Sequence, residues 1–242
     1  MLSNYNSPAE TLIYRRDERL FNDVILSIIA GSLFLGLLLI FWVNYYFPFK
    51  GSMIFASVTC ISIATYLFSK AWKNYRAVKL MNVGIKSERD VGHFLQQNIA
   101  PLGYRVLNSL NRNNHDIDHI IVGPTGVYCI ETKNLQWMIE NPVEFDGNLI
   151  TVNGKELPRK DPIKQSKSAA AEVSAFLQAY DIQLFVTPVV LLPGRIIHGI
   201  QSNQIIVGNM KIFEEYIHSA EPILSAKQVK LFADVLSHLN QH

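Results

Sequence analysis

The stretch HDIDHIIVGPTGVYCIETKN, residues 115–134, contains the strongest fold signal in the chain. Two apolar runs flank a Gly-Pro-Thr-Gly segment, and glycine and proline in that arrangement favour a tight turn between strands. The stretch therefore predicts a β-hairpin. If Gly123 faces Gly126 across the turn, counting outward places Asp118 directly opposite Glu131.

Charged side chains gather at the open end of this predicted hairpin. Side chains two residues apart on a strand share a face, so Asp116, Asp118, Glu131 and Lys133 are expected on one side of it. Two carboxylates about 5 Å apart repel by about 3 kcal/mol at an effective dielectric constant of about 20. Lys133, which faces Asp116 in this register, offsets part of that repulsion, and a divalent cation held by two carboxylates would offset more. The pattern favours a metal site, with Asp116 as the partner of the lysine, and leaves open a surface cluster of salt bridges.

The first third of the chain is apolar. Residues 24–47 contain no charged side chain, and residues 53–68, MIFASVTCISIATYLF, form a second apolar run after a short turn. A helix needs about 20 apolar residues to cross a bilayer core. We therefore expect a two-helix transmembrane hairpin over residues 23–69 in a lipid bilayer, following a cytoplasmic tail at residues 1–22. A buried core hairpin and a signal peptide are the alternatives, and the second apolar run argues against a signal peptide.

Basic residues predict the orientation of this hairpin. Residues 1–86 carry nine lysines and arginines against four acidic residues, whereas residues 87–242 carry thirteen against sixteen. In the first segment, Lys50 alone lies in the turn, and the others flank the apolar runs. Because lysine and arginine concentrate on the cytoplasmic side, both flanks are expected in the cytoplasm. Small residues four apart, such as Ser27 and Gly31, are compatible with a homo-oligomer through these helices.

A basic juxtamembrane helix or linker at residues 70–84, with a break expected at residues 82–84, precedes the predicted cytoplasmic domain at residues 85–242. We expect an α/β domain with a mixed β-sheet flanked by helices, because helical and strand patterns alternate along it. Cys60 and Cys129 both lie in apolar runs, so neither a disulfide framework nor a cysteine-rich zinc site is expected. The elements expected after this segment are helices at 85–98, 162–180, 211–218 and 225–240, and strands at 104–110, 137–140, 149–152, 187–193 and 204–208, besides the hairpin.

Four motifs in chain order carry a resemblance to a known family. They read Gly84-Ile85-Lys86-Ser87-Glu88, then Ile117-Asp118-His119 with Pro124-Thr125-Gly126-Val127, then Glu131-Thr132-Lys133-Asn134, and finally Asp161-Pro162-Ile163-Lys164-Gln165. In this order they resemble the nuclease-related domain, NERD, of the PD-(D/E)XK nuclease superfamily, over residues 84–179. Ser87 stands where the family has its second glycine.

The resemblance implies that residues 85–242 form a NERD-like nuclease domain with a restriction-endonuclease-like core, a metal-dependent nuclease that hydrolyses DNA phosphodiesters. Asp118 and Glu131 would be metal ligands, and Glu88 would be a ligand or would orient the waters of the metal. Lys133 would orient the attacking water or stabilise the phosphate, and Gln165 would project towards the same site. Mg²⁺ or Mn²⁺ is the implied cofactor, and it would supply Lewis acidity and lower the pKa of a bound water.

DNA is the expected partner, and its phosphates require positive charge on the binding surface. The wide occurrence of the family in bacteria implies an inner (plasma) membrane protein, and incoming phage or plasmid DNA is the expected target. A non-catalytic nuclease-fold adaptor in a membrane complex and an RNA nuclease are the alternatives that the sequence leaves open. A basic cluster is expected to contact the phosphates, and the alternative is that it forms an ordinary solvated face. Its residues are Lys155, Arg159, Lys160, Lys164 and Lys167.

Overall fold

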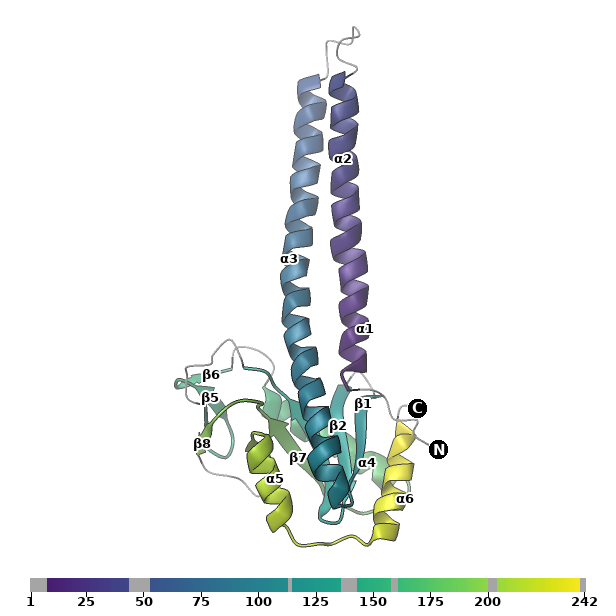
Figure 1. The fold of residues 1–242 in the computed structure, drawn as a ribbon, viewed down its shortest axis with the longest axis vertical. Helices are drawn as coiled ribbons and strands as arrows, with labels where there is room; N and C mark the ends of the chain where they lie inside the picture. The colour runs from purple at the N-terminus through teal and green to yellow at the C-terminus, as the bar shows by residue number, and fades with distance from the viewer. Residues whose placement is uncertain are drawn as a thin grey trace. The chain divides into compact units, whose positions relative to one another are not determined.

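The computed structural model describes residues 8–43, 53–112, 115–135, 143–157, 161–199 and 204–239. The chain forms two compact units. One is Leu12–Val83, and the other combines Met1–Thr11 with Gly84–His242. The first is helical, and the second contains the β-sheets (Figure 1).

Two long helical stretches build the first unit. α1 (Glu10–Arg19), a π-helical segment (Leu20–Ile25) and α2 (Leu26–Val43) follow one another without a break, and α3 (Met53–Phe94) returns. A Cβ added at Gly31 would lie 3.2 Å from the Phe68 ring, so that glycine lets α2 and α3 of the same chain approach closely.

Among the described residues, one helix is long and apolar enough to cross a membrane, Glu10–Trp42. The predicted second membrane helix is not found there, so the transmembrane hairpin is not confirmed. The apolar part of α3 ends at Lys70 and is shorter than the roughly 20 residues that a crossing needs. The predicted break at residues 82–84 is also wrong, because α3 continues through it; one helical glycine costs only about 1 kcal/mol.

The larger sheet of the second unit has the order β1-β2-β3-β7-β9. Its strands are β1 (Arg105–Arg112), β2 (His115–Gly123), β3 (Gly126–Thr132), β7 (Val186–Leu191) and β9 (Ile206–Gly208). β1, β2 and β3 pair antiparallel, whereas β3, β7 and β9 pair parallel. The mixed sheet and the α/β class predicted from the sequence are therefore confirmed.

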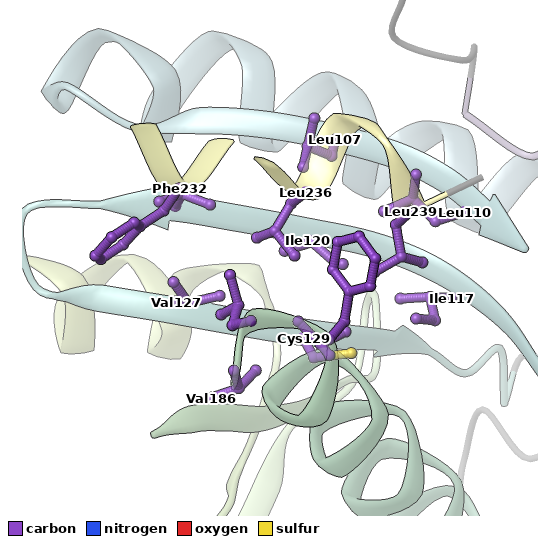
Figure 2. Packing of buried hydrophobic residues seen from close by; sticks show 14 of the residues in the cluster. Leu107, Leu110, Ile117, Ile120, Val127, Cys129, Val186, Phe232, Leu236 and Leu239 are labelled. Atoms are coloured by element: carbon purple, nitrogen blue, oxygen red, sulfur yellow. The ribbon is translucent and has the colours of Figure 1, made fainter. Parts of the chain in front are cut away.

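Helices cover both faces of this sheet. α4 (Pro162–Gln178) and α6 (Ala226–Ser237) bury one face, and Figure 2 shows side chains of that cluster packed between strands and helices. The end of α3, the π-helical segment Leu95–Ile99 and α5 (Met210–Ser219) bury the other. A 3-10 turn, Ala100–Leu102, leads from the π-helical segment into β1. α4 begins as the sequence predicts, because the Asp161 side chain accepts a hydrogen bond from the Ile163 backbone at 3.0 Å.

A second, smaller sheet was not predicted. It has the order β6-β5-β4-β8, with β4 (Val143–Phe145), β5 (Ile150–Val152), β6 (Lys155–Glu156) and β8 (Ile197–Gly199). Strands of two or three residues are too short to show an alternating pattern, so only β5 was expected. The strand predicted at residues 137–140 lies outside the described residues.

Candidate active site

The β2–β3 hairpin has the register that its turn predicts. The ladder runs from Gly123 opposite Gly126 to His119 opposite Ile130. It ends there, and Asp118, the next residue along β2, has no ladder partner on β3. The two strands therefore separate where the sequence places its carboxylates.

The ladder between β1 and β2 is interrupted at the same place. Pairs are present on both sides of Ser109 and Asp118, which oppose each other in this register, but no pair joins these two residues. Ser109 has φ +47°, in the left-handed region that non-glycine residues rarely adopt. β2 is thus open at Asp118 along both of its edges.

The carboxylate of Asp118 replaces the missing ladder contact. Its Oδ2 accepts a hydrogen bond from the backbone N–H of Thr132 at 2.7 Å. Meanwhile β3 stays paired with β7, and the Lys133 N–H donates to the Leu191 carbonyl at 2.9 Å. Asp118 is therefore fixed to the end of β3 by its side chain.

Asp116 does not face Lys133 as the extended register predicts. It pairs with Asn111 on β1 instead. The prediction is wrong because it assumed a regular ladder along the whole hairpin, whereas β3 follows β7 away from β2 at this end. The alternation of faces also changes here, since Ile117 packs in the same cluster as Ile120, and Ile121 packs in the other.

The carboxylates of Glu131 and Glu88 lie close enough to Asp118 to oppose its ionisation. Burial raises the pKa of Asp118 well above its usual value, and the nearby charges of Glu131 and Glu88 raise it further. The Thr132 amide and Lys133 act in the opposite direction on this pKa. The structure thus brings Glu88, Glu131 and Lys133 close to Asp118.

Glu88 is the most enclosed of these acids. It is 3% exposed, compared with 7% for Glu131. Burial raises its pKa to about 7, against hydrogen bonds from the Ala9 backbone and the Ser109 hydroxyl that lower it. Both donors contact the same oxygen, Oε1, at 2.7 and 3.1 Å. Oε1 is therefore engaged by protein donors.

The donor set fits a hard divalent cation held by two protein carboxylates. No group of three His, Cys, Asp or Glu side chains within the described ranges is arranged to hold a metal, so the expected three-ligand set with Glu88 is not found. Asp118 and Glu131 remain, and Mg²⁺ is commonly held by one or two carboxylates and several waters. Between Glu131 and Lys133, the Thr132 hydroxyl is buried and makes no hydrogen bond to the described residues, which fits a bound water at this point.

The other residues predicted for the site are more dispersed. Gln165 lies half-buried near the start of α4, and its backbone N–H donates to the Asp161 carbonyl. Lys155 is exposed on β6, and Lys164 is exposed with its Nζ 4.0 Å from Asp161. Lys167 is half-buried on α4, while Arg159 and Lys160 lie outside the described residues.

Neighbouring polar residues support the site in ways that the sequence does not reveal. The Asn134 side chain donates a hydrogen bond to the Ser87 hydroxyl, which ties α3 to the segment after β3. Ser87 stands where the family motif has a glycine. Because glycine has no side chain, it could not accept this hydrogen bond from Asn134. His119 is fully buried, and its Nδ1 lies 2.9 Å from Asn108 Oδ1. Burial lowers its pKa to about 3, so the ring is neutral and packs in the core.

Comparison with known protein families identifies this segment. Residues 83–193 match the family model of the nuclease-related domain, NERD. This segment of the chain is similar to a nuclease-related domain. The NERD segment begins in the last part of α3, ends just after β7, and includes Glu88, Asp118, Glu131 and Lys133. No curated protein and no solved structure matches the chain.

Proposed function

We propose that the protein is a membrane-anchored nuclease that hydrolyses DNA phosphodiester bonds with the help of a divalent metal ion. The observation that carries the proposal is the pair Asp118 and Glu131, which lies beside Lys133 where β2 and β3 separate. This pair lies inside the NERD segment, and the family is nuclease-related. A buried carboxylate such as Asp118, whose pKa is raised by neighbouring carboxylates, is typical of functional sites.

The side chains have distinct tasks in this proposal. Asp118 and Glu131 would hold Mg²⁺ or Mn²⁺, which supplies Lewis acidity and a more acidic bound water. Lys133 would place its ammonium group against the non-bridging oxygens of the phosphate and stabilise the charge that develops there. In hydrolysis, a water oxygen bonds to phosphorus, the bond to the leaving sugar oxygen breaks, and that oxygen gains a proton. Glu88 would orient the waters of the site.

Basic side chains on the surface would contact the DNA phosphates, and the nuclease-related family suggests the kind of DNA that is cut. Lys155 and Lys164 are exposed and would contact the DNA backbone together with Lys167, Arg159 and Lys160. Gln165 would reach the same site from the start of α4. Incoming phage or plasmid DNA is the substrate that a nuclease at the inner face of a bacterial membrane would meet first.

The membrane anchor rests on the apolar helix Glu10–Trp42. The basic residues that flank the apolar runs support a cytoplasmic nuclease domain. Fractionation tests this part: an anchored protein stays in the membrane pellet after a high-salt and carbonate wash and is released by detergent. Release by the wash alone would contradict the anchor.

Cleavage by the purified full-length protein in detergent tests the activity. With Mg²⁺ or Mn²⁺ it should cut plasmid DNA, and Asp118→Ala or Glu131→Ala should lower the rate about 1,000-fold, since a metal contributes several kcal/mol to such reactions. Glu215→Ala, which removes an exposed carboxylate from α5, is the matched control and should cut at the parent rate.

Labelled RNA in the same assay separates the alternatives. Cutting of RNA but not DNA would make the protein a ribonuclease. If the folded protein cuts neither and titrations show no affinity for Mg²⁺ or Mn²⁺, the adaptor alternative replaces the nuclease.

A further inference from the structure

The residues immediately before α1 are buried next to Glu88. Ala9 is 0% exposed, and its backbone N–H donates to Glu88 Oε1 at 2.7 Å. The N–H of Glu10 donates to the Ser109 hydroxyl at 3.1 Å, and that hydroxyl donates to the same Glu88 oxygen at 3.1 Å. Two hydrogen bonds from this segment, one direct and one relayed by the Ser109 hydroxyl, therefore lead to one carboxylate oxygen of the candidate active site.

Both direct donors to Glu88 have an unusual backbone. Ala9 has φ +64° and Ser109 has φ +47°, and neither is a glycine. A non-glycine residue in this region costs about 1–3 kcal/mol, and such strain persists where the surrounding contacts require it, often at functional sites. The two strained residues meet at the Glu88 carboxylate, so the strain is associated with the orientation of this group.

Pro8, just before α1, packs closely against Gly92 of α3. A Cβ added at Gly92 would lie 2.6 Å from Cγ of Pro8 and 3.3 Å from the His119 ring. Only glycine at this position of α3 lets Pro8 pack against the helix. Alanine normally stabilises a helix relative to glycine by about 1 kcal/mol. Gly92 is therefore unfavourable for α3 itself, but it makes room for the contact with Pro8.

We propose that Pro8–Glu10 is a positioning segment of the nuclease site, acting through the Ala9 amide and Ser109 to orient the carboxylate of Glu88 beside Asp118. This rests on the proposed function. Two donors on one oxygen fix the rotation of a carboxylate, and loss of such supporting hydrogen bonds typically lowers activity about 10–100-fold. Because α1 begins at Glu10, the orientation of the site depends on the residues that start the candidate membrane helix.

Amide hydrogen exchange of the full-length protein in detergent tests the contact without using activity. Gly92→Ala should displace Pro8 and raise the exchange rate of the residue 9–11 amides at least about tenfold. Glu88→Ala should do the same by removing the acceptor. Gly36→Ala is the matched control, because a Cβ there meets nothing within 4 Å, and it should leave these rates unchanged. Slow exchange in the β2–β3 amides checks that each variant is folded.

DNA cleavage by the same proteins tests the positioning role. Gly92→Ala and Ser109→Ala should each lower kcat about tenfold with KM for DNA unchanged, while Gly36→Ala matches the parent. Parent exchange rates and parent kcat in Gly92→Ala and Ser109→Ala would overturn the inference, and so would a raised kcat, which would make the segment inhibitory. If the parent cuts no nucleic acid, the proposed function fails, and the exchange rates still decide whether Pro8–Glu10 binds to Glu88.

Discussion

The two ends of the β2–β3 hairpin contain the same two strands and differ in how polar groups are satisfied. At the turn end the ladder is complete, and Thr125 Oγ1 lies 2.7 Å from the Tyr104 hydroxyl and 2.6 Å from the Tyr128 hydroxyl. At the open end the ladder stops before Asp118, and carboxylates crowd together with a raised pKa. The comparison indicates that the turn end stabilises the fold, whereas the crowded carboxylates at the open end lower its stability.

Substitution of Gly123 should have the largest effect on stability. A Cβ at this position would overlap the Tyr104 ring, so Gly123→Ala forces the ring out of its packed position. Overpacking of this kind costs about 3 kcal/mol. The free energy of unfolding, measured by urea denaturation, should fall by this amount, while Gly36→Ala should change it by less than about 1 kcal/mol. An unchanged midpoint would show that the turn end does not depend on this contact.

Removal of the charge at Glu88 should stabilise the open end in a pH-dependent way. The pKa of Glu88 is about 7 in the folded protein and 4.5 ordinarily, so folding opposes its ionisation. Its favourable contribution is present below about pH 4.5 and is lost as the pH rises through 7. Glutamine keeps a neutral acceptor for the Ala9 and Ser109 donors and does not ionise.

With EDTA present, Glu88→Gln should therefore be more stable than the parent by about 2 kcal/mol at pH 6, and the two should be nearly equal near pH 4.5. Denaturation curves at both pH values measure this difference. A difference that grows towards acid would contradict the assigned burial of the carboxylate, and added Mg²⁺ should reduce the difference by stabilising the parent.

Loss of the Thr125 hydroxyl should have the smallest effect of the three. Thr125→Val keeps the shape and removes the group that lies between Tyr104 and Tyr128, so the free energy of unfolding should fall by about 1 kcal/mol. DNA cleavage should stay at the parent rate, because the substitution lies at the other end of the hairpin. A loss of cleavage without a loss of stability would show that the two ends are coupled.

Much of the fold was predictable because its signals are local. The Gly-Pro-Thr-Gly segment specifies the turn. The turn then determines the register of β2 against β3 as far as His119 and Ile130. Asp161 before a proline specifies the start of α4. The family motifs identified Glu88, Asp118, Glu131 and Lys133, and the structure brings these side chains together.

Other features depend on contacts between distant residues. The end of the β2–β3 ladder depends on the pairing of β3 with β7, more than fifty residues later in the chain. The contact between Ala9 and Glu88 joins residues 79 positions apart and uses a backbone N–H, which every residue except proline has. No sequence pattern marks such a donor.

Local sequence signals were enough to predict the α/β class and the hairpin register as far as His119 and Ile130, because turn chemistry and alternation act over a few neighbouring positions. The opening of β2 at Asp118, the pairing of Asp116 with β1 and the contact of the N-terminal segment with Glu88 depend instead on residues far apart in the chain. The reason is physical: a strand follows whichever neighbour offers better pairing and burial, and those neighbours are brought together by folding.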